Sequence, residues 1–405
     1  MTTVSTTGVL SAERANTVLK NFGKAKLSDY FGDLVVYRNL EPLDRRIQGR
    51  KNASYKMEIP AEGIPRKQDR DYAKAAVWIA RQAAQKVRRG NAQLEEILFI
   101  GDTLYNDGHA YSNMADVGEW RGACFIGGEK PNDAPSAEID AGNVFNTNRW
   151  AALSDWMKWV LSVGLKADEH TVVIVDIDKT ALGAKGRNDQ VINEARLEGI
   201  YRTMDAVLGD NFDKAKFENH YHELNRSRYH FLTEDNQDYL AYVCMALNAG
   251  LFDTTELMRD IQNGSVDNFE QFIRMVHTRL VIGGVGGESL RQAHEAVSAS
   301  VLNGDPTPFK HFRRQEFITT VERMGNLPDT SSVDELLAQE ITLTNEVCEV
   351  TEWLAARGCL MMCMSDKPDE ASQPDRHASP DVPPVHQVST HRVGTSIADE
   401  LKELG

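Results

Sequence analysis

A run of five consecutive β-branched residues, Thr171-Val172-Val173-Ile174-Val175, constrains the fold of this chain more than any other sequence feature. The run has no polar face, so we expect a central strand that is covered on both sides. Strands of this kind occur in parallel sheets whose two faces are packed with helices. The sequence therefore predicts an α/β fold with a parallel sheet.

Other strand and helix patterns lie on both sides of this run along the chain. Apolar runs at 97–100, 123–126 and 360–364 predict further buried strands. Small and apolar residues recur at three- and four-residue spacings in 71–89, which predicts a long amphipathic helix that Gly90 ends. The α/β pattern is therefore present before the central strand and returns near the C-terminus.

The middle of the chain has a different pattern. No proline occurs from 181 to 305, and apolar residues recur there with helical spacing, which predicts an all-helical domain. We expect this domain to span about 181–345, between a first core segment, 1–180, and a second, 346–405. Residues 127–147 are rich in Gly, Pro, Asp and Asn and are predicted to form a linker.

Three shorter segments complete the expected architecture. Ser11–Phe22 is predicted to be a helix that ends at Gly23, and 34–37 is a short apolar run. The proline-containing tail at 369–390 is expected to be irregular, and 396–404 to be a short helix.

Composition limits the classes of partner. The chain has 405 residues, enough for two domains, and its net charge of −15 disfavours binding to nucleic acid or acidic membranes. The five cysteines are dispersed without a CxxC pair, and no apolar run reaches membrane-spanning length. We expect a cytoplasmic protein with reduced thiols, and the sequence leaves open whether it forms a homo-oligomer.

Two carboxylates follow the central strand directly. Asp176 and Asp178 are two residues apart, and Thr180 comes next in the same segment. Ligands of open parallel sheets collect at the carboxyl ends of the strands. One carboxylate there can attack a phosphorus centre while the second delivers a proton to the leaving oxygen. The alternative is that an aspartate after the strand only caps the following helix.

Polar groups also follow two other predicted strands. Asp102 and Asp107 come after the strand at 97–100 and could bind a hard cation through oxygen, although a turn with a helix cap would use the same residues. Ser365 and Lys367 follow the strand at 360–364, where alone they indicate only a turn. Together the three strand ends supply the carboxylates, hydroxyl and lysine that phosphoryl transfer through an aspartyl intermediate needs.

In combination these segments resemble the haloacid dehalogenase (HAD) superfamily. The first motif of that family, DxDx[TV] after a strand, is matched by Asp176, Asp178 and Thr180. The second, a strand ending in Ser or Thr, is matched by Ser365, and the acidic GDxxxxD fourth motif by Asp102 and Asp107. The resemblance covers about half of the chain and implies a Rossmann-like sheet with an inserted all-helical cap.

The order of the motifs differs from that of most relatives. The segment that matches the fourth motif precedes the one that matches the first, so the chain resembles a circularly permuted member, with 127–147 joining the former ends. A permuted core is assembled from both ends of the chain. It predicts that the strands ending at Ile100, Val175 and Met364 lie side by side.

The resemblance implies a role for each matched residue. Asp176 would be the nucleophile that forms a phosphoaspartate, and Asp178 the general acid and then the base. Mg²⁺ would be bound by Asp176, the backbone carbonyl of Asp178 and Asp102, with Asp107 in support. Ser365 and the lysine of the third motif would hold the phosphoryl oxygens.

The third-motif lysine has three candidates. Lys67 precedes the long helix at the position where relatives keep this residue, and we favour it. Lys74 lies inside the same helix, and Lys367 follows the second motif. The ordinary role of each is that of a solvated surface lysine.

Two further groups have an ordinary and a functional interpretation. Arg187 lies in the segment that would face the site, where it could contact an anionic substrate, although a surface arginine is favoured. His377, His386 and His391 could suggest zinc, but their irregular spacing without partnering cysteines favours surface histidines.

The predicted function is that of a Mg²⁺-dependent phosphatase that acts on a small phosphorylated metabolite. One alternative is a catalytically silent binding or regulatory protein with the same fold. The other is a phosphotransferase or mutase that passes the phosphoryl group from the same intermediate to an alcohol.

Overall fold

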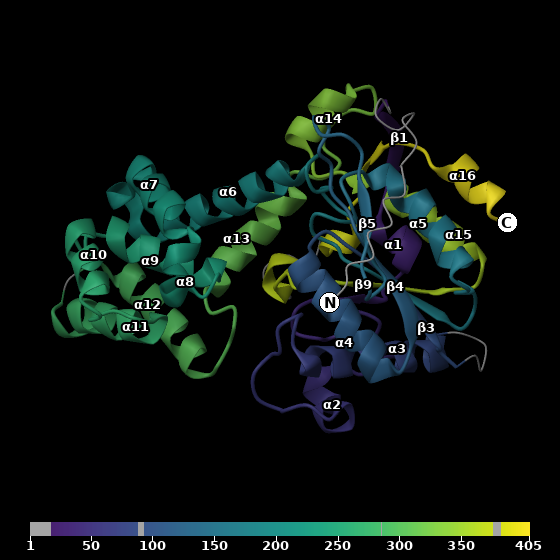
Figure 1. Ribbon diagram of the computed structural model, residues 1–405. Helices are drawn as coiled ribbons and strands as arrows, with labels where there is room; N and C mark the ends of the chain where they lie inside the picture. Colours follow the sequence, from purple (N-terminus) through teal and green to yellow (C-terminus); the bar gives the residue numbers. More distant parts are fainter. Residues whose placement is uncertain (1–17, 88–92, 285, 376–381) are drawn as a thin grey trace. The chain divides into compact units, whose positions relative to one another are not determined.

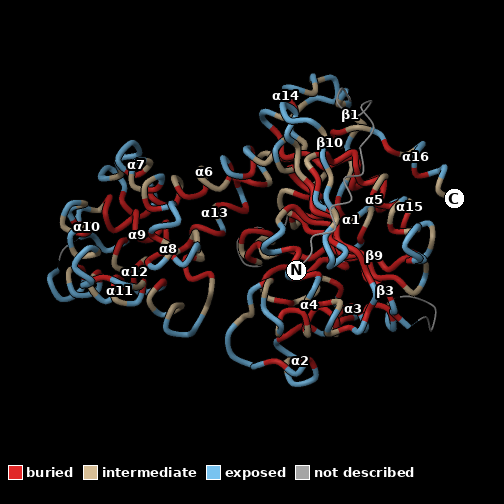
Figure 2. The backbone as a smooth tube through the Cα atoms, viewed as in Figure 1, coloured by how far each residue is buried: buried red, intermediate tan, exposed pale blue. Residues whose placement is uncertain are grey.

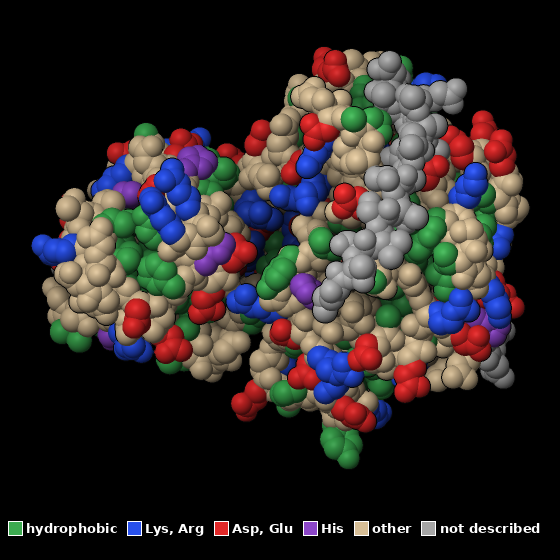
Figure 3. All heavy atoms as spheres, in the orientation of Figure 1, with side chains coloured by type: hydrophobic (Ala, Val, Ile, Leu, Met, Phe, Trp, Pro, Cys, Tyr) green, Lys and Arg blue, Asp and Glu red, His purple; other side chains and the backbone are tan. Residues whose placement is uncertain are grey.

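The structure, a computed structural model, describes residues 18–87, 93–284, 286–375 and 382–405. The chain divides into two compact units. Unit 1 comprises the described residues of Met1–Ala61, Pro65–Ala195 and Thr320–Gly405, and unit 2 comprises those of Glu62–Ile64 and Arg196–Thr319. Acidic and basic side chains are interspersed over the face of the molecule that Figure 3 shows.

A seven-stranded sheet forms the centre of unit 1 (Figure 1). Its strands lie in the order β2 (Val35–Val36), β9 (Leu360–Met364), β7 (Thr171–Val175), β3 (Glu96–Gly101), β4 (Arg121–Ile126), β6 (Val144–Thr147) and β5 (Ala137–Ile139). Every neighbouring pair is parallel except β5 and β6, which are antiparallel. The predicted α/β fold with a mostly parallel sheet is confirmed.

The three strands that precede the polar motifs are neighbours in this sheet. β7 lies between β3 and β9, with Val175 opposite both Ile100 and Cys363. The predicted adjacency of these strands is therefore confirmed, although β9 is separated from β7 by more than 180 residues of chain. Because all three strands are parallel, their carboxyl ends meet at one edge of the sheet.

Helices cover both faces of the sheet, as the buried β7 run predicts. On one face, Ile97 and Phe99 of β3 share a core with Tyr72 and Ala76 of α3 (Arg70–Val87) and with α4 (His109–Gly118). Alternate strand residues point to the other face, where α5 (Leu153–Ser162) contacts β4 and α15 (Asn345–Ala356) contacts β9. The buried segments concentrate between these layers (Figure 2).

The predicted linker at 127–147 is wrong in its second half. Two strands, β5 and β6, form there and extend the sheet beyond β4. Their short length and polar residues conceal the strand pattern, but Val144 and Phe145 of β6 are buried. This segment is therefore part of the sheet rather than a connection alone.

A second, three-stranded sheet joins the two ends of the chain. β10 (Thr390–Gly394) pairs antiparallel with β1 (Lys20–Ala25) and parallel with β8 (Leu343–Thr344). The predicted Ser11–Phe22 helix is wrong from Val18 onward, where β1 follows at Lys20, and its residues before Val18 lie outside the described part of the chain. Asn21 and Lys24 in β1 pair with β10 and gain tertiary hydrogen-bond partners that local sequence does not reveal.

The remaining helices of unit 1 are short. They are α1 (Leu27–Phe31), α2 (Arg50–Met57), the π-helical turn η2 (Leu104–Gly108), η3 (Trp150–Ala152), α14 (Val333–Gln339), η7 (Asp369–Ala371), η8 (Val385–Gln387) and α16 (Ala398–Glu403). The expected short helix near the C-terminus corresponds to α16. The expected end of the long helix at Gly90 lies outside the described residues.

The region from α6 to α13 is helical, as predicted. Its elements are α6 (Asp189–Leu208), η4 (Gly209–Asn211), α7 (Lys214–Leu224), η5 (Ser227–Tyr229), α8 (His230–Thr233), α9 (Gln237–Asn248), α10 (Thr254–Gln262), α11 (Phe269–His277), η6 (Thr278–Ile282), α12 (Glu288–Leu302) and α13 (Lys310–Val321). Unit 2 has its own core of buried aromatic and aliphatic side chains, among them Phe217, Tyr242 and Phe272. Within the described ranges, no helix combines the length and the apolar character needed to cross a membrane.

Candidate active site

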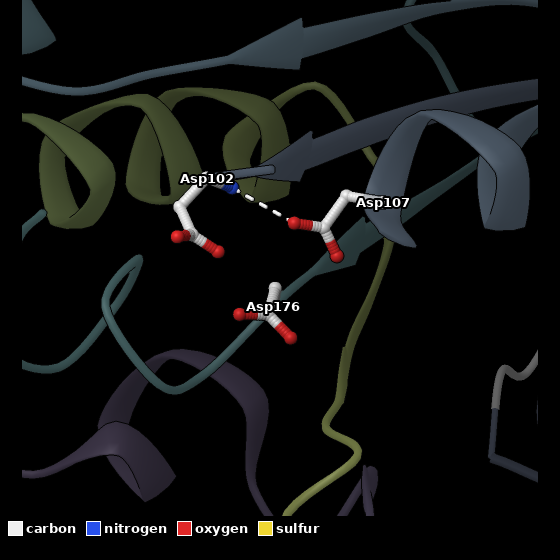
Figure 4. Close-up of side chains that lie close together, drawn as sticks. All are labelled: Asp102, Asp107 and Asp176. Carbon is white, nitrogen blue, oxygen red and sulfur yellow. Dashed lines mark hydrogen bonds between the residues drawn. The ribbon is translucent and has the colours of Figure 1, made fainter. Parts of the chain in front are cut away.

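Three aspartates meet at the edge where the parallel strands end (Figure 4). Asp176 follows β7, Asp102 follows β3, and Asp107 lies in η2. Each of the three contributes a carboxylate oxygen to a set in which all oxygens lie within 4.8 Å of one another. Across the described ranges, no other group of three or more acidic, histidine or cysteine side chains has this geometry.

The adjacent strands fix the positions of these aspartates. The backbone amide of Asp176 donates to the carbonyl of Ile100 at 2.8 Å, which continues the β7–β3 ladder to the residue itself. Asp107 Oδ2 accepts hydrogen bonds from the amides of Asp102 and Thr103, each at 2.9 Å, and from the Thr103 hydroxyl at 3.1 Å. The loop after β3 is therefore closed by one of the three carboxylates.

Lys67 places a cation between two of the carboxylates. Its Nζ donates to Asp107 Oδ1 and to Asp176 Oδ1, both at 2.5 Å, and only 4% of its side chain is exposed. It lies three residues before α3, whose alanine-rich face packs against the sheet. Lys67 is therefore a buried member of the site and not a solvated lysine.

The other two candidate lysines differ from each other in position. Lys74 donates to Asp71 and to the carbonyl of Glu58, away from the aspartates. Lys367 is buried, and its Nζ lies 3.5 Å from Asp178 Oδ2. The structure thus brings Lys67 and Lys367 to the carboxylates but not Lys74.

The second strand end adds a hydroxyl. Ser365 is buried directly after β9, its amide donates to the Val36 carbonyl at 2.9 Å, and its Oγ accepts the Lys367 amide at 3.1 Å. These bonds continue the sheet past β9 and turn the chain so that Lys367 reaches Asp178.

The turn after β7 is tight. Lys179 has φ of 64°, a left-handed conformation that non-glycine residues rarely adopt. The turn leaves Asp178 partly exposed, while Thr180 is fully buried, and its Oγ1 has no hydrogen-bond partner among the described residues. The matched Asp-x-Asp-x-Thr segment is therefore a strained turn at the strand end and not a simple helix N-terminus, since α6 begins only at Asp189.

Burial and mutual repulsion shift the pKa values of the three carboxyls. Burial raises the pKa of Asp176 well above its ordinary value, against the lowering effect of Lys67. Burial and the Asp107 charge raise the pKa of Asp102 to about 6. Burial acts on Asp107 as well, but the Lys67 ammonium and the hydrogen bonds to this carboxylate lower its pKa below the ordinary value.

These shifts show that the group is short of positive charge. Burial lowers the pKa of Lys67, but Asp107 and Asp176 raise it more, so this lysine stays protonated. Lys67 offsets at most one of the three carboxylate charges, and burial together with the charges of Asp107 and Asp102 raises the pKa of Asp176. A set of oxygen-only ligands suits a hard divalent cation such as Mg²⁺, so the triad could hold a metal ion.

Lys185 is a site residue that the sequence analysis did not identify. Its Nζ donates to the carbonyl of Asp102 at 2.6 Å and lies 3.3 Å from Asp102 Oδ2. Lys185 begins the segment 185–189, which the sequence predicts to face the site, but the only residue of that segment with a predicted role is Arg187.

Arg187 does not lie at the surface, and the expectation of a surface arginine is wrong. Only 3% of its side chain is exposed, and its guanidinium makes two 2.9–3.0 Å hydrogen bonds to Glu346 and one of 2.9 Å to Glu129. Two carboxylates therefore already balance its charge. The predicted contact of Arg187 with substrate stays a prediction.

The expectation of surface histidines is wrong for two of the three tail histidines. His386 is buried beside Asp33, and His391 is buried between Glu340 and Asp329. His377 lies outside the described residues. The two described histidines make separate hydrogen bonds to these carboxylates, which hold the tail against the rest of unit 1.

The fold and site together define an α/β protein with a mostly parallel seven-stranded sheet and a buried aspartate triad at its carboxyl edge. No protein-family model, no curated protein and no solved structure matches this chain.

Proposed function

We propose that this chain is a Mg²⁺-dependent phosphatase related to the HAD superfamily by circular permutation, which hydrolyses a small phosphorylated metabolite through a phosphoaspartate at Asp176. The observation that carries the proposal is the convergence of Asp102, Asp107 and Asp176 within 4.8 Å, with Lys67 bonded to two of them. Carboxylates, a lysine and a hydroxyl at adjacent strand ends are the groups that this chemistry uses.

The residues present fit a magnesium ion. Asp102 and Asp176 would hold it, with the backbone carbonyl of Asp178. Asp107 uses both oxygens for Lys67 and the β3 loop, so its contribution is chiefly to position the others. Bound Mg²⁺ would offset the negative charge of a phosphoryl group next to these carboxylates.

In the first half-reaction Asp176 is the nucleophile. Lys67 bonds its Oδ1, the oxygen that would also hold the ion, which leaves Oδ2 to attack phosphorus. The new Oδ–P bond forms as the bond from phosphorus to the leaving oxygen breaks, and Asp178 gives that oxygen its proton. The products are the free alcohol and a phosphoaspartate.

In the second half-reaction water replaces the aspartate. Asp178, now a carboxylate, removes a proton from the water as its oxygen attacks phosphorus. The Asp176–phosphorus bond breaks, orthophosphate leaves, and both aspartates return to their initial states. Lys367, 3.5 Å from Asp178, and Ser365 beside it would bind phosphoryl oxygens on this side.

Phosphate release tests the proposal directly. We expect release from p-nitrophenyl phosphate and from some of a panel of phosphorylated metabolites with Mg²⁺, none with EDTA, and none from the folded Asp176→Asn variant. Full activity of Asp176→Asn would contradict the nucleophile assignment. Phosphate transfer to an added alcohol with little free phosphate would identify a phosphotransferase or mutase instead.

One observation favours a second candidate, a catalytically silent binding protein. Lys67 and Lys185 already place two ammonium groups on the triad, and Lys185 contacts Asp102, a proposed metal ligand. A protein of this kind would bind phosphorylated ligands without releasing phosphate from any of them. The Lys185→Met variant separates the two candidates. If Lys185 takes the place of the ion at Asp102, as in the binding protein, its removal should strengthen Mg²⁺ binding. If Lys185 and the ion bind together, as in the phosphatase, its removal should not strengthen Mg²⁺ binding.

A further inference from the structure

A pocket of about 720 Å³ adjoins the candidate active site within unit 1. Asp102 and Lys185 line it on the site's side, and its other walls come from the turn after β4 and from the β5–β6 hairpin. A volume of this size accommodates a small molecule. The pocket is therefore placed to receive the part of a substrate that extends away from the phosphoryl group.

The hairpin contributes two polar side chains to one wall. Glu138 and Asn146 are directly opposite each other in the antiparallel β5–β6 pair, so their side chains share one face of the hairpin. Both line the pocket, and neither side chain has a hydrogen-bond or ion-pair partner among the described residues. Lys130, from the turn after β4, is a third such lining side chain.

Other polar side chains of the wall are already occupied. Glu129 pairs with Arg187, and the Asn148 side chain bonds the Ala134 carbonyl and the Ser136 amide. Lys185 is held by Asp102. The groups left for a ligand are the Glu138 carboxylate, the Asn146 amide, the Lys130 ammonium and the Ser136 hydroxyl, whose net charge is zero.

The free groups indicate the chemistry of the occupant. A carboxylate accepts two hydrogen bonds, an amide both donates and accepts, and an ammonium donates. Adjacent hydroxyls of a ligand can bond with all of these groups and with the Ser136 hydroxyl, because each hydroxyl both donates and accepts. Among the described residues that line the pocket none is aromatic, so it offers a nucleobase or an aryl group no stacking surface.

We propose that this pocket binds the leaving group of the substrate, and that this leaving group is an uncharged polyol or sugar with neighbouring hydroxyls that contact Glu138 and Asn146. The proposal rests on the proposed phosphatase function for its catalytic meaning. It gives residues 127–148 a role in specificity.

A matched pair of substrates tests it. Glycerol 3-phosphate and n-propyl phosphate share a three-carbon chain and a phosphate and differ only in two hydroxyls. We expect the wild-type kcat/KM for glycerol 3-phosphate to exceed that for n-propyl phosphate at least about tenfold, as for a site built to bond hydroxyls. In the double variant Glu138→Ala/Asn146→Ala, the ratio of the two kcat/KM values should fall toward one, because neither substrate can then contact these side chains of the hairpin.

The control variant is Glu295→Ala, which removes an exposed carboxylate of unit 2 and should keep the wild-type ratio. The use of a ratio cancels any loss of folded enzyme. A wild-type ratio near one, or a double variant that keeps the full preference, would overturn the proposal.

Binding gives a readout that does not require turnover. Calorimetric titration of Asp176→Asn with both phosphates should show about tenfold tighter binding of glycerol 3-phosphate, lost in the triple variant with Glu138→Ala and Asn146→Ala. If this binding preference is found but the wild-type protein turns over no substrate, the phosphatase proposal is overturned and the proposal that the pocket binds neighbouring hydroxyls is supported. Phosphate release without any preference would overturn the pocket and leave the phosphatase proposal standing.

Discussion

Lys67 stabilises the aspartate triad because its ammonium, buried with them, bonds Asp107 and Asp176 together. Removal of one partner from a buried ion pair leaves a charge without compensation, which typically costs about 3–5 kcal/mol. Protonation of the triad can absorb part of that cost here, because the pKa of Asp176 is already raised.

The Lys67→Met variant should therefore fold but lose function. We expect kcat for p-nitrophenyl phosphate to fall at least about a hundredfold, as for loss of an electrostatic group at a reacting centre. Lys74→Met is the matched control, since Lys74 contacts Asp71 and Glu58 and not the triad. Equal losses in the two folded variants would contradict the role of Lys67.

The pKa of Asp102 predicts how magnesium binding depends on pH. Its folded value of about 6 lies above the ordinary 3.8, so between these values the metal-free folded state binds more protons than the unfolded chain. The stability contributed by this group is full below pH 3.8 and is lost as pH rises through about 6. Mg²⁺ favours the ionised form and should therefore stabilise the protein more as pH rises.

We expect the Mg²⁺-induced increase in Tm to be larger at about pH 7.5 than at about pH 5. The quantity to measure is the difference in Tm between samples with and without Mg²⁺. Burial also raises the pKa of Asp369 to about 6, but its effect on Tm is the same in both samples and cancels in the difference. Asp102→Asn should remove the increase. An increase that does not depend on pH would contradict the assignment of Asp102 as a ligand.

At this scale the sequence predicts which residue types the site contains but not all of their contacts. The Asp-x-Asp-x-Thr segment and the acidic loop are readable because both directly follow strands. Lys67 is more than 100 residues from Asp176 in the chain, and the preference for it over Lys74 comes from the family resemblance and not from a local pattern. Lys185 lies in the segment predicted to face the site, but a single lysine in a loop has no pattern that predicts its contact with Asp102.

At the scale of elements, Gly101 connects β3 to the triad. A Cβ atom at this position would lie 2.5 Å from Cβ and Cγ of Asp107, closer than packed atoms approach. Asp107 cannot move aside without breaking its bonds to Lys67 and to the Asp102 amide.

Gly101→Ala should therefore destabilise the protein by about 1–3 kcal/mol, a typical cost of overpacking, and weaken Mg²⁺ binding. Urea unfolding and calorimetric titration measure the two effects. Gly108→Ala is the control, because its added Cβ meets only the flexible end of Leu104 at 3.2 Å. A Gly101→Ala protein that binds Mg²⁺ as tightly as the wild type would show that the loop geometry is not required.

Elements with an uninterrupted apolar pattern are predicted well, and those that depend on distant partners are not. The expected central strand has the same bounds as β7, because its burial on both faces leaves a continuous β-branched run. β5 and β6 are missed because they have only three and four residues, and polar residues of both line the pocket. β5 is the edge strand of the sheet and β6 is its neighbour. β1 is mistaken for helix because its pairing partner, β10, lies at the other end of the chain.

At the scale of the whole molecule, the large sheet takes strands from both sides of unit 2. β2, β3, β4 and β7 precede the main segment of that unit, Arg196–Thr319, and β9 follows it, yet β9 lies between β2 and β7. The presence of a helical insertion is readable from the proline-free, helix-periodic stretch. The ends of this insertion are harder to predict from the sequence, because α6 begins in unit 1 at Asp189 and continues into unit 2 without a break.

Removal of most of unit 2 should leave unit 1 folded. α6 and α13 approach closely at Gly199, where a Cβ would lie 2.7 Å from the Glu316 amide nitrogen, so a few glycines can join the chain across a deletion of 200–315. We expect a cooperative thermal transition and Mg²⁺-induced stabilisation in this variant. Deletion of 346–405 is the contrasting variant, since it removes β9 from within the sheet and should abolish the transition. Failure of the first variant to fold would contradict the independence of unit 1.

The central claim is that Asp176 carries the phosphoryl group, and chemical trapping tests it most directly. Enzyme mixed with substrate and Mg²⁺ is quenched in acid and treated with borohydride, which reduces an acyl phosphate to an alcohol and so converts the modified aspartate to homoserine. Peptide mass spectrometry should find homoserine at position 176, only when substrate is present and not in the Lys67→Met control. An unmodified Asp176 during turnover, or homoserine at 102, 107 or 178 instead, would contradict the account.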